Sequence, residues 1–163
     1  MTQVVIRPAI RTDVPVILDL IRGLAAYERL ADDCVATEAL LDASLFGEAP
    51  GAEVLLAEWD GASAGFALFF PNYSTFLARR GIWLEDLYVR PAYRGRGIGR
   101  ALLRRLAEIT VEREGGRLEW SVLDWNESAI GFYRSLGAVA MDGWTTFRMS
   151  GYALEQLAAG RGR

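Results

Sequence analysis

The stretch VRPAYRGRGIGRALLRRLAE, from Val89 to Glu108, places three glycines and several arginines between two apolar segments. The segment before it, residues 82–89, is mostly apolar, as in a strand that is covered on both faces. The segment after it, residues 99–114, repeats its leucines at helical spacing. Glycine lets a backbone turn tightly and lets a ligand approach it closely. The stretch therefore predicts a strand, a tight loop and a helix in succession.

The loop at residues 94–99 is also a candidate anion site. The first turn of a helix has N–H groups without helical partners and carries the positive end of the helix dipole. Such a site suits a pyrophosphate, and Arg94, Arg96 and Arg100 add charge around it. The alternative is an ordinary turn with solvated arginines. The chain has no Gly-Lys-Ser/Thr sequence for a Walker loop, and the loop comes too late in the chain for a dinucleotide fold.

Length and composition indicate one globular domain over residues 1–163. Hydrophobic residues make up 52% of the chain, which is enough for a sizeable core. The 18 basic and 21 acidic residues give a net charge of −3, which argues against a nucleic-acid partner. No apolar run approaches the roughly 18 residues of a membrane span, so no membrane partner is expected.

The absent residue types exclude several chemistries. The chain contains no histidine, which rules out a Ser-His triad, a Cys-His pair and histidine-containing zinc sites, and we expect no metal. Its single cysteine, Cys34, cannot form a disulfide within the chain and fits a reducing, cytoplasmic compartment. Any acid or base must therefore be Glu, Asp, Tyr, Lys, Cys or a backbone group.

Periodicity and capping signals predict alternating strands and helices. The expected strands are residues 3–9, 52–59, 64–70, 82–89 and 117–124, with a last strand or hairpin at 138–151. The expected helices are residues 13–28 after a Thr12 cap, 38–46 after a Thr37 cap, 99–114, and 126–136 with Asn126 as cap. Residues 71–81 are expected to form a loop. This order predicts an α/β domain.

Two motifs resemble the GCN5-related N-acetyltransferase (GNAT) family. YRGRGIGRALL matches the Arg-x-x-Gly-x-Gly loop that binds acetyl-coenzyme A in that family, and DWNESAIGFYRSLGA, residues 124–138, resembles its second cofactor motif. The resemblance implies a central mixed, mostly antiparallel sheet that is flanked by helices and splayed in the middle to hold acetyl-CoA. It also implies acetyl-CoA as co-substrate.

Further segments are similar to the diamine (spermidine/spermine-type) acetyltransferase branch. They include LAAYERL, YSTF, WLEDLYV and DGWTTF, and the segments YST and VLDWN are closest to thialysine-type members. The resemblance implies a small-molecule primary amine as substrate and a homodimer. Diamine-type members carry an acidic residue where this chain has Ser74 and Thr75. Arg79 and Arg80 make the same segment basic, which favours an acceptor with its own carboxylate, such as thialysine, over a long polyamine.

The family's cofactor contacts can be carried over to matching positions. The implied cofactor-binding residues are Leu87, Tyr88, Val89, Arg94, Gly95, Arg96, Gly97, Ile98, Gly99, Arg100, Asn126, Ser128 and Tyr133. Backbone N–H groups near Leu87 to Val89 are expected to bind the thioester oxygen, which requires the strand to separate from its neighbour there.

Acetyl transfer to an amine needs a neutral nucleophile, whereas an alkylamine has a pKa near 10.4. Glu85 matches the family's proposed base, acting through water, and we expect it to lie against an apolar face that raises its pKa. Asp86 points to the other face unless a β-bulge changes the alternation. Tyr133 matches the family's acid for the thiolate. The alternatives are a solvent-facing Glu85 and a core Tyr133.

A cationic amine is recognised by carboxylates and aromatic faces. The implied substrate-binding residues are Tyr27, Glu28, Glu85, Asp86, Glu119, Trp120, Ser121 and Asp142. Solvated surface charges are the alternative interpretation of Glu28 and Asp142. Two further functions remain open: acetylation of a protein, peptide or aminoglycoside, and non-catalytic sensing of acyl-CoA. The presence of both Glu85 and Tyr133 speaks against a sensor.

Overall fold

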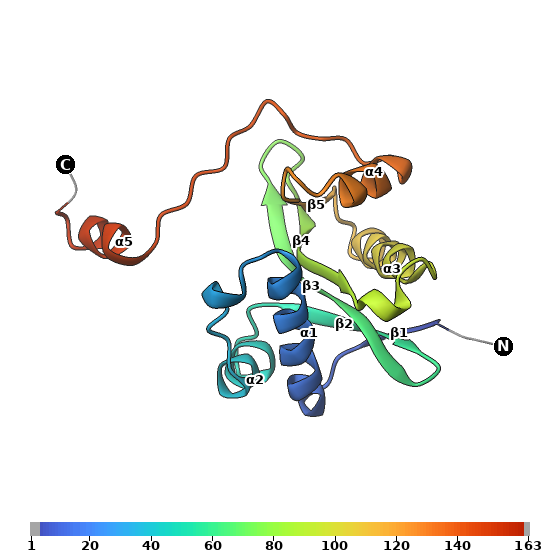
Figure 1. The fold of residues 1–163 in the computed structure, drawn as a ribbon. Coiled ribbons are helices and arrows are strands. Elements are labelled where there is room, and N and C mark those ends of the chain that lie inside the picture. Colours follow the sequence, from blue (N-terminus) through green and yellow to red (C-terminus); the bar gives the residue numbers. More distant parts are fainter. Residues whose placement is uncertain (1–3, 162–163) are drawn as a thin grey trace. The chain divides into compact units, whose positions relative to one another are not determined.

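The computed structural model describes residues 4–161 of the chain (Figure 1). The chain divides into two compact units, of which the first ends at Leu123 and the second begins at Asp124. The expectation of a single domain over residues 1–163 stays a prediction.

The first unit is a five-stranded sheet with helices packed on it. Its strands are β1 (Val4–Pro8), β2 (Glu53–Trp59), β3 (Ala62–Ser74), β4 (Arg79–Val89) and β5 (Leu118–Trp120). Its helices are α1 (Val14–Tyr27), α2 (Glu38–Phe46) and α3 (Ile98–Glu112), with single turns η1 (Arg11–Asp13), η2 (Ala31–Asp33) and η3 (Pro91–Tyr93). The strands lie in the order β1-β2-β3-β4-β5, and only β4 and β5 are parallel. The predicted mixed, mostly antiparallel sheet flanked by helices is confirmed.

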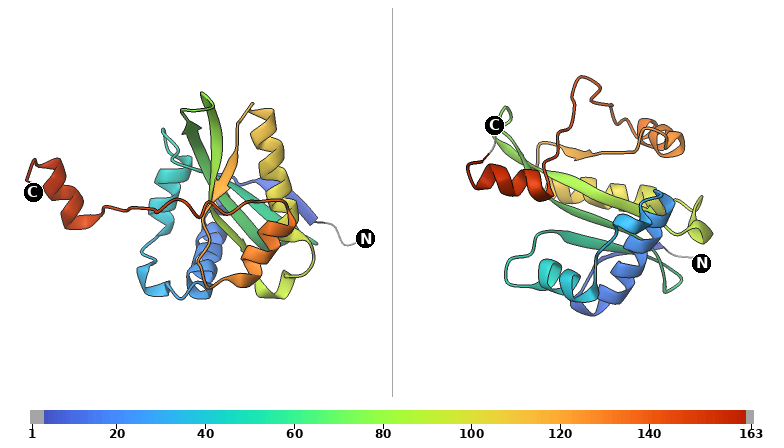
Figure 2. Two further views of the ribbon diagram at one scale, coloured as in Figure 1. Left: turned by 90° about the horizontal axis from the view of Figure 1, so that it is seen from above. Right: turned by 60° about the vertical axis from the view of Figure 1, so that its left-hand side comes forward.

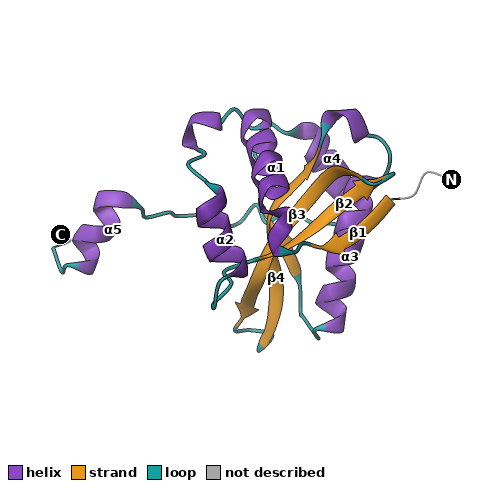
Figure 3. Ribbon diagram, turned by 90° about the horizontal axis from the view of Figure 1, so that it is seen from below, coloured by secondary structure: helices purple, strands orange, loops and turns teal. Residues whose placement is uncertain are grey.

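Both faces of the sheet are covered. Figures 2 and 3 show α1 and α2 on one face and α3 on the other. In β2, Val54 and Leu56 belong to the cluster that packs on α1 and α2, whereas Leu55 and Ala57 are buried on the opposite face. The fully buried Phe66 anchors the first cluster, and burial of such a side chain contributes about 2–3 kcal/mol. This double cover explains the continuous apolar runs of the central strands.

A glycine allows α1 to lie very close to β4. A Cβ atom built on Gly23 would come within 2.8 Å of the Tyr88 hydroxyl oxygen and 2.9 Å of its ring. Tyr88 is buried and belongs to the cluster between α1 and the sheet. Gly23 therefore fixes the distance between the end of α1 and the second half of β4.

Helix boundaries follow local signals in most places. The Thr37 hydroxyl accepts a hydrogen bond from the Leu40 N–H at 3.2 Å, so the predicted cap of α2 is confirmed. Thr12 does not cap α1, because residues 11–13 form a separate turn and α1 begins at Val14. Gln3, the first residue of the predicted 3–9 strand, lies outside the described residues.

The predicted 71–81 loop is wrong. β3 continues to Ser74 and β4 starts at Arg79, so only residues 75–78 form the turn. Pro71 and Asn72 favoured a loop in the sequence, but pairing with β4 outweighs these local preferences. The strand predicted at 117–124 is reduced to Leu118–Trp120.

The second unit contains two helices, α4 (Glu127–Ser135) and α5 (Gly151–Ala158). The strand or hairpin predicted at 138–151 is wrong, because residues 138–150 form neither strand nor helix in the described structure and Gly151 begins α5. An alternating apolar pattern forms a strand only when a neighbouring strand pairs with it. No such partner exists within the described part of this unit.

Candidate active site

A β-bulge in β4 re-aims two neighbouring carboxylates. In the ladder with β3, Leu68 pairs with Asp86 and Phe69 pairs with Leu84, so the register passes over Glu85. Leu68 packs against the α1 cluster, and its partner Asp86 therefore faces α1. The β-bulge that would change the alternation is therefore present in β4.

Asp86 lines an open hollow of about 240 Å³ between α1, η2 and β4. The lining residues are Ile21, Leu24, Ala25, Glu28, Leu30, Asp33, Cys34 and Asp86. The walls are mainly apolar and carry three carboxylates. We call this hollow the acidic pocket. It brings together Glu28 and Asp86 among the predicted substrate contacts.

The acidic pocket raises the pKa of its carboxyl groups. Burial, followed by the negative charges of Glu85 and Glu28, raises the pKa of Asp86 to about 6. Burial also raises the pKa of Glu28 above its usual value. Within residues 4–161, neither the Glu28 nor the Asp86 carboxylate forms an ion pair with an arginine. A positively charged ligand would relieve this repulsion, so the pocket is suited to a cationic amine.

Glu85 does not lie against an apolar face, so that expectation is wrong. Its side chain is exposed, and its Oε2 accepts a hydrogen bond from the Trp83 indole Nε1 at 2.8 Å. The bulge gives the half-buried position to Asp86 instead. This hydrogen bond holds the Glu85 carboxylate beside the Trp83 side chain of the same strand, β4.

The substrate contacts predicted on β5 and directly after it do not lie in the acidic pocket with Glu28 and Asp86. The Glu119 carboxylate accepts a hydrogen bond from Asn72 Nδ2 at 2.7 Å and pairs with Arg117 at 2.7 Å. Trp120 is half-buried at the end of β5, and Ser121 follows it in an exposed position. None of these three residues lines the acidic pocket.

Ser74 does not reach the acidic pocket either. It is buried at the end of β3, and its Oγ accepts a hydrogen bond from the Leu77 N–H at 3.2 Å. Its role in the structure is to close the turn before Arg79, where the resemblance implied a substrate loop.

Beyond Leu84, β4 loses its neighbour on one side. The parallel pairing with β5 ends at Leu84 and Trp120, whereas β4 continues to Val89. Within residues 4–161, no strand covers this edge of β4 from Glu85 onward. The predicted separation of the strands is present, and the backbone from Leu87 to Val89 can offer hydrogen bonds there.

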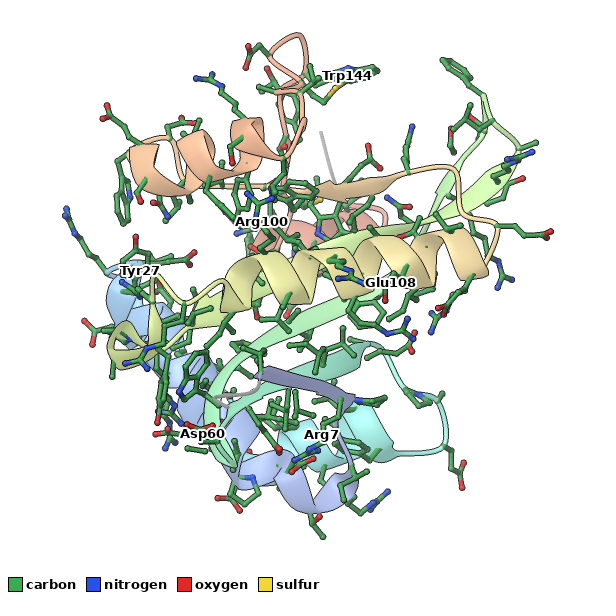
Figure 4. The ribbon with its side chains drawn as sticks, turned by 90° about the vertical axis from the view of Figure 1, so that its right-hand side faces the viewer. Arg7, Tyr27, Asp60, Arg100, Glu108 and Trp144 are labelled. Atoms are coloured by element: carbon green, nitrogen blue, oxygen red, sulfur yellow. The ribbon has the colours of Figure 1, made fainter. Side chains whose placement is uncertain are left out.

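The loop between η3 and α3 has the geometry of a cradle. Gly95 and Gly97 have φ angles of 75° and 79°, which L-residues rarely adopt. A Cβ built on either glycine would meet no atom within 4 Å, so space for a ligand lies directly above the backbone. Gly97 caps α3, and the exposed Arg100 lies on the first turn of that helix (Figure 4). We call residues 94–100 the glycine loop.

Aromatic rings support both arginines of the glycine loop. The Arg94 guanidinium lies 4.6 Å from the ring centroid of Tyr27 and 5.8 Å from that of Tyr88, and its Nε donates to the Val89 carbonyl oxygen at 2.9 Å. Arg96 lies 4.9 Å from the Trp59 ring and 5.9 Å from the Tyr93 ring. Tyr27, a predicted substrate contact, thus lies beside the glycine loop (Figure 4).

The second unit holds the other predicted site residues. Asn126 caps α4 by accepting a hydrogen bond from the Ala129 N–H at 3.2 Å, as predicted. Tyr133 is half-buried, and its ring centroid lies 5.5 Å from that of Phe132. Ser128 and Asp142 are exposed.

Among the polar side chains that line the acidic pocket, sequence reasoning missed Asp33 and Cys34. Both follow α1 in the short turn η2 and its cap. The acidic pair Asp32-Asp33, a few residues after Glu28, was the available signal. Cys34 is half-buried there. Among the helices of the described chain, none is long and apolar enough to cross a membrane.

Comparison with known proteins identifies the family. The model of the acetyltransferase (GNAT) family matches residues 23–138. Thialysine N-epsilon-acetyltransferase from Bos taurus is 40% identical, with 97% of this chain and 99% of the relative aligned. L-ornithine N5-acetyltransferase from Arabidopsis thaliana is 36% identical, with coverages of 93% and 86%. An integron cassette protein from V. cholerae superimposes with a TM-score of 0.81 at 27% identity, covering 95% of this chain and 97% of its own. This chain therefore belongs to the GNAT family of N-acetyltransferases.

Proposed function

We propose that this enzyme transfers an acetyl group from acetyl-CoA to the primary amine of a small molecule, which is a thialysine-like amino acid, a diamine or a polyamine. The acidic pocket carries this proposal, because Glu28 and Asp86 gather negative charge in an apolar hollow of about 240 Å³. A cationic amine gains ion pairs there and lowers the raised pKa of both carboxyls. The similar thialysine and ornithine acetyltransferases support an amine of amino-acid size.

The glycine loop fits the pyrophosphate of the co-substrate that GNAT enzymes use. Open space above Gly95 and Gly97 admits phosphate oxygens to the backbone N–H groups at the start of α3. Arg96 and Arg100 supply positive charge around it, and the free edge of β4 supplies backbone groups from Leu87 to Val89. Acetyl-CoA would supply the activated acetyl group. Asn126 and Ser128 of the second unit complete the proposed contacts.

The amine must lose a proton before it can react. Glu85 accepts that proton through a water molecule in the proposed mechanism, and the hydrogen bond from Trp83 holds its carboxylate in place. Asp86 is the alternative base, supported by a pKa of about 6 and by its position in the acidic pocket. Tyr133 donates its phenolic proton to the sulfur that leaves. Glu119, Trp120, Ser121 and Asp142 remain proposed as outer contacts of the acceptor.

A second copy of the chain is the proposed partner. Within the described part of the second unit, no packing covers the large apolar side chains along residues 139–157: Val139, Met141, Trp144, Phe147, Met149, Tyr152, Leu154 and Leu157. Exposed apolar surface of this kind marks interaction sites. Sedimentation of the purified protein would yield the mass of a dimer, and a monomer at micromolar concentration would contradict the proposal. The cytoplasmic location stays a prediction.

A thiol-release assay with acetyl-CoA tests the function. The acceptors are thialysine, ornithine, lysine, putrescine, spermidine, a peptide with a free N-terminus and an aminoglycoside. We expect turnover with one of the small amines and a strong loss of turnover in Tyr133→Phe. Tyr73→Phe is the matched control, because Tyr73 is exposed on β3 and the substitution removes only one hydroxyl.

The same assay separates the competing functions. Turnover with only the peptide or the aminoglycoside would move the substrate to that class. Binding of CoA in a calorimeter without turnover of any amine would favour an acyl-CoA sensor and contradict the catalytic roles of Glu85 and Tyr133.

A further inference from the structure

The backbone of the glycine loop is too flexible to hold one conformation by itself. Gly95 and Gly97 flank Arg96, and glycine loses more conformational freedom than any other residue when it is fixed in one conformation. Neither glycine has a side chain that could hold the loop in the shape needed for phosphate binding. Between residues 94 and 97, the side chains that can hold the loop in place through contacts are those of Arg94 and Arg96.

Both arginine side chains lie over aromatic rings from distant parts of the first unit. Trp59 is the last residue of β2, and Tyr27 is the last residue of α1. Arg96 lies 4.9 Å from the Trp59 ring centroid and Arg94 lies 4.6 Å from the Tyr27 centroid. Both distances are within the range of favourable cation–π contacts, and each such contact at an exposed site contributes about 0.5–1 kcal/mol.

The two arginines are held in different ways. Arg94 donates its Nε to the Val89 carbonyl and lies near two tyrosine rings, so it ties the glycine loop back to β4 and α1. Arg96, in contrast, makes no hydrogen bond or ion pair with any other residue between 4 and 161. A guanidinium that lies over a ring by its face keeps its N–H donors at the edge, where they can bind phosphate oxygens. Arg96 is thus the arginine that is both positioned and available.

We propose that Trp59 is a positioning residue for the co-substrate, because its ring holds Arg96 and with it the glycine loop in the conformation that binds the phosphates of CoA. Tyr27 has the same function for Arg94, as an anchor of the loop in addition to any contact with the amine. This inference rests on the proposed binding of acetyl-CoA to the glycine loop.

Calorimetry with CoA tests the role of Trp59. We expect Trp59→Leu to raise the Kd for CoA about 2–5-fold, which corresponds to a lost contact of 0.5–1 kcal/mol. Trp59→Phe keeps a ring face and should retain most of the affinity. The steady-state constants should divide accordingly: the KM for acetyl-CoA rises in Trp59→Leu, whereas kcat and the KM for the amine stay unchanged.

A double-mutant cycle with Arg96→Ala separates positioning from general packing. If Trp59 acts through Arg96, Trp59→Leu has little further effect on CoA binding once Arg96 is gone. Phe76→Leu is the control, because Phe76 is an almost fully exposed ring in the turn at residues 75–78. Independent effects of the two substitutions, or unchanged affinity in Trp59→Leu, would overturn the inference alone. A wild-type protein that does not bind CoA would overturn the proposed co-substrate together with it.

Discussion

The acidic pocket and the glycine loop handle charge in opposite ways. The pocket holds Glu28 and Asp86 in partly buried positions, where burial raises the pKa of both carboxyls. The glycine loop keeps Arg94 and Arg96 exposed and supports them on aromatic rings. Like charges gathered in a partly buried site carry a free-energy cost until a cation enters, whereas exposed charges on rings carry little cost and can adjust. The first unit thus combines a partly buried site of negative charge with an exposed loop whose arginines and backbone N–H groups are suited to an anion.

The largest expected effect separates the two neighbouring carboxylates of β4. Glu85→Gln should lower kcat by a factor of about 10² or more, because general-base assistance is lost, and leave the KM for the amine nearly unchanged. Asp86→Asn should chiefly raise the KM for the amine, because the pocket loses a charge. Kinetics at several pH values check this. The opposite division, with kcat lost in Asp86→Asn, would make Asp86 the base.

A second test acts on the shape of the glycine loop. Gly97→Ala should weaken CoA binding about tenfold, because a φ of 79° costs an L-residue roughly 1–2 kcal/mol and the new methyl group enters the cradle. Gly160→Ala is the control, since Gly160 also has a positive φ, 69°, but lies after α5. Equal CoA affinity in wild type and Gly97→Ala would refute the cradle.

The pocket carboxyl should affect stability in a pH-dependent way. The pKa of Asp86 is about 6 in the folded protein against 3.8 for an ordinary Asp, so the folded state binds this proton more tightly than the unfolded chain does. Its contribution to folding stability is therefore present at low pH and is lost as the pH rises from about 4 through 6, by roughly 1–3 kcal/mol.

Asp86→Asn lacks that loss. In urea unfolding without ligand, its stability relative to wild type should increase between pH 4 and pH 7. The exposed Asp32 of η2 provides the control substitution Asp32→Asn. A difference between Asp86→Asn and wild type that does not change with pH would show that Asp86 titrates normally.

The smallest effect concerns salt. Exposed arginines at the glycine loop are screened by ions, so the KM for acetyl-CoA should rise a few-fold when the ionic strength increases from about 0.05 to 0.3 M. The pKa of Asp86 should change less with ionic strength, because burial is the main reason that this pKa is raised. A KM for acetyl-CoA that is independent of salt would mean that backbone groups alone bind the phosphates.

Local signals in the sequence predicted much of this arrangement. The glycine loop before α3, the Thr37 and Asn126 caps and the separation of β4 from β5 all depend on short segments or on the family's motif. Their physics is local, since a cap or a glycine turn is determined by a few neighbouring residues.

The remaining features depend on contacts between distant segments. Asp86 is half-buried and Glu85 is exposed, contrary to the expectation, because the ladder with β3 skips one residue of β4. The alternation of side chains within β4 does not reveal such a skipped residue. The support of Arg96 by Trp59 joins β2 to the glycine loop, and the role of η2 in the acidic pocket depends on where α1 ends. Residues 138–151 were predicted as a strand or hairpin because their alternation was considered without a pairing partner.

The close approach of α1 to β4 at Gly23 has a consequence for redesigning the acceptor range of this enzyme. A side chain at that position would have to displace the Tyr88 ring, so the spacing between β4 and the α1 wall of the acidic pocket depends on this glycine. The opposite wall is formed by residues 30–34, a short turn whose side chains are mostly exposed. If the acidic pocket binds the amine as proposed, substitutions at Leu30, Asp33 and Cys34 should yield an enzyme that accepts a larger or less basic amine with the least change to the core.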